Sequence, residues 1–381
     1  MGTIMSVFKD GNSWAYKGKI AIPFEPGKYK SYYKRGFSKK KDAQRAEQLF
    51  RDNFSTHQKD ITFDELVNLY RANYRTQNVK ESTLIGDESY YRLHIQPVLG
   101  KYPLSQVTTQ AIDLWKSYMI KKPKTERKKN KNEYYSTATI NHAKSVISKY
   151  LSYAVRLGFI SYNPCHNVPS YQNKEELKEK KEIKFWEVNE FKTFIASVDE
   201  KRWNDIFTFL FFTGLRESET FALSWRDVDF QKCTLRINKS ITYKTKAAPW
   251  KITTPKNENS IRIIDLQDTL LDRLKNRLEK EKHKDGFTLD YFIFGDIKPV
   301  SRSDLARKMD YFIQLSGVSR ITPHGLRHSH ASFLIKSKID DSLIAERLGH
   351  TVAELRKTYA HIYDSMRQDM KRILDETCKI E

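Results

Sequence analysis

The stretch "FFTGLRESETFALSWRDVDF", residues 211–230, joins an apolar run to a charged centre. The run Phe209–Phe212 predicts a buried helix that Gly214 ends, which would deliver Arg216 to an inner surface of its domain. A buried guanidinium needs a partner because burying an unpaired charge is costly. Glu219 lies three residues beyond Arg216, on the same helical face, and we expect it to orient the arginine. Taken alone, the pattern favours a structural Arg–Glu pair.

A lysine-bearing turn is predicted downstream, in "TTPKNENSIRIIDL", residues 253–266. Pro255, Lys256 and Asn257 favour a hairpin turn between two strands, from whose tip Lys256 would project. By itself this is one lysine among many, so the signal is weak.

A third segment, "TPHGLRHSHASFLI", residues 322–335, predicts a helix with a charged first turn. Thr322 and Pro323 fit the N-cap and the first helical position. His324 and Arg327 then share a face near the amino-terminal end of the helix, where the helix dipole favours an anion.

The same segment has the histidine spacing of a zinc helix, at His324 and His328. The metalloprotease pattern, however, needs glutamate where Gly325 stands, so a metal site is not favoured. For His328 and His330 we predict ordinary helix packing.

The fourth segment, "LGHTVAELRKTYAHIY", residues 348–363, places histidine and tyrosine close together in the sequence. Gly349 can end one helix, and His350 follows it. Tyr359 lies nine residues beyond His350, so one helical face cannot hold both and the chain must turn around a common target. Taken alone, Tyr359 or Tyr363 is more often an ordinary half-buried residue than a nucleophile.

The net positive charge of the chain favours a negatively charged partner. The 381-residue chain has 68 Lys and Arg against 47 Asp and Glu, a formal net charge of +21. A phosphate polymer suits such a chain because neutralised phosphates release counterions, although a merely lysine-rich protein from an AT-rich genome would have the same balance. No apolar run reaches membrane-spanning length and no signal peptide begins the chain, so we expect no membrane partner. The three cysteines are far apart, which predicts a reduced, cytoplasmic setting without a cysteine metal site.

Residues 1–57 predict a small three-stranded sheet followed by a helix. Alternation in "SWAYKGKIAI" and "YKSYYKRGF" indicates strands, with "PFEPGK" as a turn. Basic, aromatic strands of this kind can lie in a groove of duplex DNA, although the aromatics could instead form the core of a capping subdomain. The candidate DNA contacts are Trp14, Tyr16, Lys30, Tyr32 and Lys34.

Residues 58–170 are predicted to be helical, and residues 171–184 to be a linker of mixed charge. Within the helical region, the stretch 116–131 has eight Lys or Arg and one Glu. It is predicted to be a loop that touches phosphate, with Lys121, Lys122 and Lys128 as candidate contacts, and a solvated loop is nearly as well supported. Residues 185–381 are mostly helical with a few short strands. The predicted fold is therefore mainly α with small β elements, an α+β chain.

The four segments together, in this order and at these separations, resemble the tyrosine recombinase family. The residues that carry the resemblance are Arg216 in "TGLRESE", the pair in "HGLRH", "LGH" and "TYAH". The branch that they resemble is that of the integrases of phages and conjugative transposons. The resemblance implies an arm-type DNA-binding domain at 1–57 and a helical core-binding domain at 58–170. It further implies a linker at 171–184 and a catalytic domain with a tail helix at 185–381.

For the site, the resemblance implies a covalent mechanism. Tyr359 would attack a DNA phosphate and form a 3′-phosphotyrosine, while Arg216 and Arg327 hold the non-bridging oxygens. Tyr359 is preferred to Tyr363 because the family places its tyrosine in a "TYAH" context.

Three further residues have implied roles in moving protons. His324 would assist proton movement at the nucleophile, His350 would hydrogen-bond the phosphate, and Lys256 would protonate the departing 5′-oxygen. No metal ion, nucleotide or other cofactor would be needed.

The implied partners are double-stranded DNA at attachment sites and three further copies of the chain, as a homotetramer that exchanges strands through a Holliday junction. An excisionase and a host DNA-bending protein are further expected partners. The implied activity is integration and excision of a mobile element in a bacterial cytoplasm, with the protein on the nucleoid when bound to DNA. A chromosome- or plasmid-resolving recombinase and a DNA-binding protein with a vestigial site are the alternatives.

Met366, Met370, Ile373 and Leu374 form a stripe on the tail helix, which would fold back in cis or dock on a neighbouring protomer.

Overall fold

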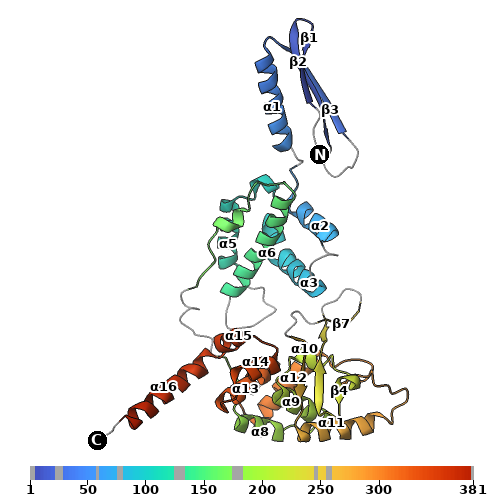
Figure 1. Cartoon of the computed structure of the whole chain (residues 1–381), viewed down its shortest axis with the longest axis vertical. Helices are drawn as coiled ribbons and strands as arrows, with labels where there is room; N and C mark the ends of the chain where they lie inside the picture. Colours follow the sequence, from blue (N-terminus) through green and yellow to red (C-terminus); the bar gives the residue numbers. More distant parts are fainter. Residues whose placement is uncertain are drawn as a thin grey trace. The chain divides into compact units, whose positions relative to one another are not determined.

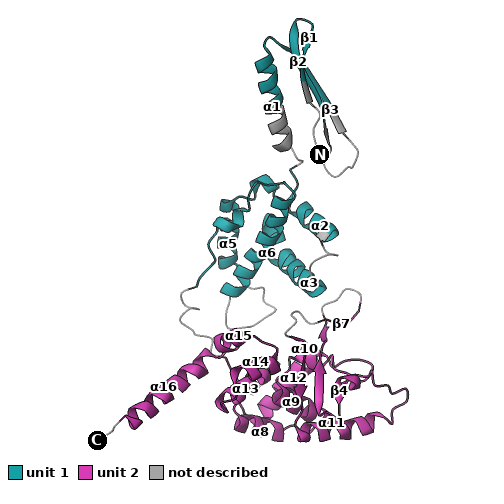
Figure 2. Cartoon of the chain, in the orientation of Figure 1, with its two compact units in different colours: residues 1–179 teal, residues 180–381 magenta. Residues whose placement is uncertain are grey.

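The structure is a computed structural model that describes residues 5–21, 29–56, 60–74, 80–123, 134–173, 183–243, 248–254 and 260–378. The chain forms two compact units, residues 1–179 and residues 180–381, which Figure 2 draws in separate colours. The division falls inside the stretch 171–184, for which a linker is expected, although residues 174–182 lie outside the described residues. Each unit encloses its own apolar core.

The amino-terminal part of the first unit is an antiparallel sheet with one helix. The strands β1 (Met5–Asp10), β2 (Ser13–Ala21) and β3 (Tyr29–Phe37) are neighbours in that order. The helix α1 (Lys40–Thr56) follows the third strand (Figure 1). The predicted three-stranded sheet and helix are therefore confirmed.

The core of this small sheet uses one of the aromatic residues that we expected to contact DNA. Tyr16 is only 3% exposed, and its ring lies 5.7 Å from that of Phe37 and 6.0 Å from that of Tyr32. Ala15 on β2 and Ala43 on α1 are fully buried, and the helix packs against this strand. Tyr16 therefore contributes to the packing of this sheet, and its role as a DNA contact stays a prediction.

The rest of the first unit is helical, as predicted. Thr62 and Glu65 cap the first helix reciprocally, since the Thr62 amide donates to the Glu65 carboxylate and the Glu65 amide donates to the Thr62 hydroxyl. Fully buried side chains such as Phe63, Trp115 and Ile147 form the core, each contributing about 1.5–3 kcal/mol. The elements are α2 (Phe63–Tyr74), α3 (Glu81–Tyr90), the π-helical turn η1 (Tyr91–Ile95), α4 (Gln96–Leu99), α5 (Thr109–Lys121) and α6 (Thr137–Arg156), with short 3₁₀ turns at Leu104–Gln106 and Pro164–Asn167.

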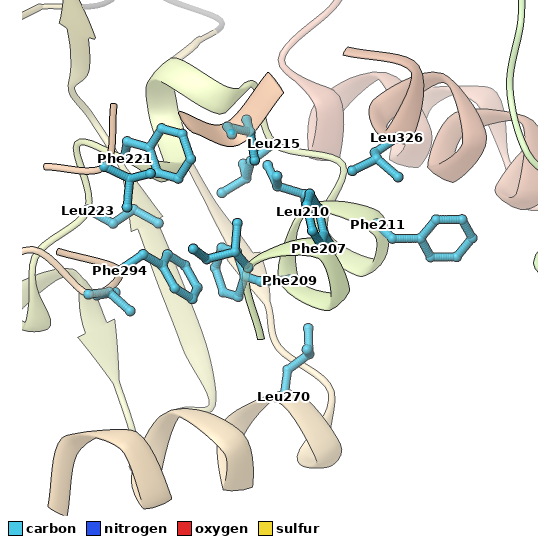
Figure 3. Packing of buried hydrophobic residues seen from close by; sticks show 14 of the residues in the cluster. Phe207, Phe209, Leu210, Phe211, Leu215, Phe221, Leu223, Leu270, Phe294 and Leu326 are labelled. Carbon is cyan, nitrogen blue, oxygen red and sulfur yellow. The ribbon is translucent and has the colours of Figure 1, made fainter. Parts of the chain in front are cut away.

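The second unit is built around a buried aromatic helix. That helix, α9 (Lys201–Thr213), supplies Phe207, Phe209 and Phe211 to the core, and Figure 3 shows Leu270 and Phe294 from later segments near it. The helices of this unit are α8 (Val188–Ala196), α9 (Lys201–Thr213), α10 (Glu217–Thr220), α11 (Asp268–Glu281), α12 (Arg302–Ser316), α13 (Pro323–Lys336), α14 (Asp341–Leu348), α15 (Val352–Thr358) and α16 (Ala360–Thr377).

Short strands cover one part of this core in two separate sheets. Antiparallel pairing gives one sheet in the order β4 (Val228–Asp229), β5 (Thr234–Ile237) and β8 (Arg262–Asp265). A second sheet pairs β6 (Ser240–Thr242) with β7 (Lys251–Thr253).

The pairing of these strands corrects one prediction. A hairpin was expected between the strands on either side of Lys256, which are β7 and β8. In the described residues β7 pairs with β6 and β8 pairs with β5, so the two flanking strands belong to different sheets. Lys256 itself lies outside the described residues.

The tail helix α16 begins against the second unit and leaves an apolar stripe exposed. Ile362 is buried and Met366 packs against the small cluster around it. Met370, Ile373 and Leu374 are between 53% and 57% exposed, so this part of the stripe does not fold back onto the described part of its own chain. No helix among the described residues combines the length and the hydropathy that crossing a bilayer requires.

Candidate active site

Arg216 lies just after the sharp end of α9. Gly214 ends that helix with φ +66°, and a Cβ at this position would lie 2.4 Å from the His330 ring, so only glycine fits without a shift. The Arg216 guanidinium donates to Glu219 Oε1 at 2.8 Å, and the Arg216 amide donates to Glu219 Oε2 at 3.1 Å. The predicted Arg–Glu pair is confirmed as a contact, and it fixes both the backbone and the side chain of Arg216.

Glu219 is shared with a second arginine that the sequence analysis missed. Arg262, from β8, donates to Glu219 Oε2 at 3.0 Å, to the Arg347 carbonyl at 2.7 Å and to the Ser260 carbonyl at 3.1 Å. Burial would raise the pKa of the Glu219 carboxyl, but the guanidinium groups of Arg262, Arg216 and Arg327 lower it. Glu219 is therefore an ionised hub at neutral pH.

Arg327 is the most deeply buried of the three arginines around this carboxylate. It lies on α13, is 2% exposed, and donates to the carbonyls of Gly214 at 2.9 Å and Leu348 at 2.5 Å. These carbonyls stand at the ends of α9 and α14, so one side chain joins the termini of two helices. Burial and the neighbouring Arg216 lower the pKa of Arg327 to about 9.

His350 lies against the same guanidinium. It follows Gly349, whose φ of +65° ends α14, and its Nε2 lies 2.8 Å from Arg327 Nη2. Burial, together with Arg327 and Arg216, lowers the pKa of His350 to about 4. A neutral imidazole here can accept a hydrogen bond from Arg327 through Nε2.

The charges around this point do not balance. Arg216, Arg262 and Arg327 bring three positive charges. Among the described residues, Glu219 is the buried carboxylate that pairs with Arg216 and Arg262, and it forms no ion pair with Arg327, so positive charge exceeds negative charge in a largely buried place. Such a surplus is costly unless an anion completes it. A phosphate group has the negative charge and the acceptor oxygens that such an arrangement can bind.

Tyr359 lies at the junction of α15 and α16 with its side chain directed into the second unit. The residue is fully buried in the cluster that also contains Leu348 and Leu355. Burial raises the pKa of Tyr359 to about 12, and the nearby Arg327 guanidinium acts against that rise. The hydroxyl lies 2.9 Å from His328 Nδ1. The tyrosine is thus held in cis, in electrostatic range of the buried arginine.

Tyr363 is engaged elsewhere. Its hydroxyl donates to Asp341 Oδ1 at 2.5 Å, and Asp341 also accepts from Arg356 at 2.7 Å. Burial and the bound carboxylate raise the pKa of Tyr363. The structure therefore assigns the two tyrosines to different surroundings, and only Tyr359 is coupled to an arginine of the phosphate site.

The three histidines of α13 differ in their contacts. His324 lies among the arginines, and its pKa is lowered by burial and then by Arg327 and Arg216. His330 is buried, accepts from Arg347 Nε at 3.2 Å and packs at Gly214, as expected for a packing residue. His328 was also predicted to be a packing residue, and its hydrogen bond to Tyr359 corrects that interpretation. In the ranges that the structure describes, no group of three His, Cys, Asp or Glu residues is arranged to hold a metal ion.

The candidate DNA contacts outside this unit are only partly described. Lys34 is exposed on β3, Trp14 and Tyr32 are half-buried, and Lys30 lies in β3. Lys121 ends α5 in an exposed position and Lys122 follows it half-buried, while Lys128 lies outside the described residues. None of these residues is tested as a DNA contact by the structure, and they remain predictions.

Two residues could have been found in the sequence. Arg262 occupies an inward position of "RIID", whose four residues alternate between buried and exposed, and an arginine on the buried side of a strand signals a partner. His328 stands four residues after His324 and so lies on the same helical face as a proposed functional residue.

Three parts of the chain match known families. Residues 182–366 match the phage integrase family, residues 62–120 match the phage integrase N-terminal SAM-like domain, and residues 5–54 match the Arm DNA-binding domain. The first match lies in the second unit and the other two lie in the first unit, and residues 121–181 are the longest stretch outside them.

Curated relatives and solved structures agree with these matches. The chain is 28% identical over 336 residues to the ICEBs1 integrase of Bacillus subtilis strain 168, and the aligned residues cover 86% of each chain. It is 25% identical over 259 residues to the prophage integrase IntR of Escherichia coli strain K12, covering 62% of this chain and 60% of that protein.

The fold is similar to that of two solved integrases. A Tn1549 transposon integrase bound to transposon right end DNA superposes with a TM-score of 0.64 at 22% identity, covering 82% of this chain and 99% of that one. A lambda integrase tetramer bound to a Holliday junction gives a TM-score of 0.53 at 17% identity, covering 91% and 95%. With the ordered arginine, histidine and tyrosine motifs, these similarities show that the chain belongs to the tyrosine recombinase family, in the branch of the phage and conjugative-transposon integrases.

Proposed function

We propose that this chain is a site-specific DNA recombinase that integrates and excises a mobile element, cutting DNA through a phosphotyrosine at Tyr359. The observation that carries the proposal is the buried surplus of positive charge around Glu219, together with the hydrogen bond of the Tyr359 hydroxyl to His328 on α13, the helix that also carries Arg327. A backbone phosphate supplies the negative charge that this place lacks, and a phenol supplies the nucleophile.

In this proposal Arg216 and Arg327 bind the scissile phosphate. Arg216 and Arg327 donate to its non-bridging oxygens, where negative charge increases as the phosphorus becomes five-coordinate. His350 donates a ring N–H to the same phosphate once its bond to Arg327 rearranges. The ion pairs with Glu219 hold Arg216 in place before DNA arrives, so little reorganisation is needed during the reaction.

The covalent step replaces one phosphodiester bond by another. The Tyr359 oxygen bonds to phosphorus, the bond to the 5′-oxygen breaks, and Lys256 gives that oxygen its proton. His324 assists proton movement at the nucleophile. Because the phosphotyrosine conserves the energy of the broken bond, the 5′-hydroxyl of a DNA strand can later displace the tyrosine without ATP. The roles of Lys256 and His324 rest on the family resemblance.

The parts of the chain divide the DNA between them in this proposal. Residues 1–57 bind arm-type sites, and residues 58–170 with residues 185–381 clamp the core site, joined by the linker 171–184. The candidate contacts on exposed positions, such as Lys34 and Lys121, serve DNA backbone binding. The matches to an Arm DNA-binding domain and a SAM-like domain support this division.

A tetramer on two duplexes completes the proposal. The exposed stripe Met370, Ile373 and Leu374 on α16 is suited to dock on a neighbouring protomer, which would couple cleavage to assembly. The lambda integrase tetramer on a Holliday junction supports this assembly by similarity. An excisionase and a host DNA-bending protein are proposed as partners that determine whether the element is integrated or excised. The proposed location is a bacterial cytoplasm.

Trapping a covalent adduct tests the function. A core-site duplex with a nick beside the cleavage position releases a short fragment after attack, so resealing fails and the adduct accumulates. The full chain with this duplex, in EDTA and without nucleotide, should give an adduct resistant to denaturation, with DNA linked at its 3′ end to the peptide that contains Tyr359. Specific binding without any adduct would mean that the site is vestigial.

Removing the amino-terminal sheet and helix separates arm binding from cleavage. A chain that begins at residue 58 should cleave an isolated core site within about threefold of the full chain, because the arginine and tyrosine contacts all lie in the second unit. Recombination between full attachment sites should fall at least about tenfold, since the second binding event is lost. The readouts are adduct yield and product DNA on a gel. Equal recombination by the shortened chain would remove the arm-binding proposal.

A further inference from the structure

His328 makes the one hydrogen bond that the structure gives to the Tyr359 hydroxyl within the described residues. The distance from His328 Nδ1 to Tyr359 Oη is 2.9 Å, and the two rings meet at 67° with centroids 5.7 Å apart. This is the geometry of an in-plane imidazole nitrogen facing a phenolic oxygen, rather than of ring stacking. The contact joins residues 31 positions apart in the sequence and crosses from α13 to the start of α16.

The direction of this hydrogen bond follows from the surroundings of both groups. Burial, then the neighbouring His324 and Arg327 on α13 and His361 on α16, lowers the pKa of His328 to about 4. Burial raises the pKa of Tyr359 to about 12. Above pH 4 the imidazole is therefore neutral and the phenol is protonated. The phenol donates, and Nδ1 accepts through its lone pair while Nε2 holds the ring proton.

The same helix places this acceptor at a fixed distance from the phosphate-holding arginine. Successive residues of a helix are turned by about 100°, so around the axis of α13 His324 lies between Arg327 and His328. The rings of His324 and His328 are in edge-to-face contact, with centroids 4.7 Å apart. One rigid helix thus holds an oxyanion donor, Arg327, on one side of His324 and a proton acceptor, His328, on the other.

We propose that His328 is a catalytic residue that accepts the phenolic proton of Tyr359 during strand cleavage and returns it during strand joining. This inference rests on the proposed function, because it takes Tyr359 as the nucleophile. The Oη–phosphorus bond forms as the Oη–H bond breaks, and the proton moves to Nδ1, which makes His328 an imidazolium. In strand joining the 5′-hydroxyl oxygen bonds to phosphorus and gives its proton to Lys256, the bond from phosphorus to Oη breaks, and the phenolic oxygen takes its proton back from His328.

The acidity of the two groups decides when the proton moves. Between a phenol of pKa about 12 and an imidazole of pKa about 4, transfer before attack is strongly uphill. As Oη bonds to phosphorus its acidity rises steeply, so transfer accompanies bond formation. The negative charge of the bound phosphate also makes the imidazole more basic than it is in the free protein.

A pair of substitutions separates proton acceptance from simple positioning. In His328→Asn the amide oxygen can still accept the phenolic hydrogen bond from nearly the same position, but the side chain cannot take up the proton. We expect single-turnover cleavage of the nicked core-site duplex by the full-length variant to fall about 10²-fold at pH 7, with unchanged DNA affinity. His328→Gln, which offers the same chemistry on a longer side chain, should fall at least as far and serves as the second variant if the asparagine protein does not fold.

The pH profile provides the readout that a structural role would not change. The wild-type rate should be flat between pH 6 and pH 8, because His328 stays neutral there. The cleavage rate of the asparagine variant should instead rise about tenfold per pH unit, because hydroxide then removes the phenolic proton of Tyr359. Placing 3-fluorotyrosine at position 359, which has a more acidic phenol, should recover part of the lost rate in the variant.

His283→Asn is the matched control, since His283 is an exposed histidine of the second unit just beyond α11 and is not among the groups that act on the pKa of His328. It should cleave within about twofold of wild type. A His328→Asn protein with the wild-type rate and pH profile would overturn the inference and leave the proposed function intact. Absence of adduct from the wild-type chain on the same gel would overturn both.

Discussion

Replacing Tyr359 with phenylalanine should reduce the covalent protein–DNA adduct to the gel background while DNA binding stays within about twofold of wild type. The substitution deletes the nucleophilic oxygen, so no phosphotyrosine can form at this position. It also removes a single hydrogen bond, to His328 Nδ1, from a buried pair, at a cost of about 1 kcal/mol in the free energy of unfolding. Adduct yield on the nicked duplex, read beside a binding titration on an intact duplex, measures both effects.

Tyr363→Phe is the matched control, because it deletes a tyrosine hydroxyl one helical turn away. That hydroxyl is bound to Asp341 and is not coupled to Arg327, so cleavage should remain within about threefold of wild type. The two variants therefore predict opposite results in one assay. If Tyr363→Phe lost the adduct and Tyr359→Phe kept it, the nucleophile would be Tyr363 and the inference about His328 would fall with the assignment.

Most of the fold could be predicted because local signals and the tertiary structure agree. Alternation of apolar and polar residues near the amino terminus predicted the sheet. The 3.6-residue periodicity predicted that Ile112, Trp115 and Met119 lie on one helical face, and all three are fully buried. Glycines at positions 214 and 349 marked helix ends correctly, since both have positive φ. The pairing of β7 and β8 was not predictable in this way, because strand partners depend on contacts distant in the sequence.

For the candidate site, sequence order indicated the chemistry but not the network that supports it. The residues Arg216, Arg327, His350 and Tyr359 were identified through motifs, and the structure brings the first three together and places Tyr359 within electrostatic reach of Arg327. The sharing of Glu219 by Arg262 is a contact across 43 residues that no local pattern encodes. His328 was misread because a second histidine on a helix is usually a packing residue, and only the return of the chain at Tyr359 gives it a partner.

Arg327→Ala should have the second large effect, and it should act on catalysis and stability together. Losing one donor to the transition-state phosphate is expected to slow cleavage by about 10²- to 10³-fold. The carbonyls of Gly214 and Leu348 would also lose their buried donor, which costs about 1–3 kcal/mol each. Relief of repulsion from Arg216 and of the buried charge offsets part of this loss, so we expect the second unit to lose about 3 kcal/mol.

Arg216→Ala separates the two effects, because Arg216 binds the same phosphate in the proposal without joining helix ends. Its side chain is 33% exposed and Glu219 keeps its ion pair with Arg262, so the variant should lose a similar factor in cleavage but only about 1 kcal/mol in stability. Cleavage on the nicked duplex and hydrogen exchange of the α13 amides at fixed pH measure the two quantities. If Arg327→Ala exchanged no faster than Arg216→Ala, the buried arginine would not be joining α9 to α14. If it cleaved DNA at the wild-type rate, the phosphate would not lie at this guanidinium.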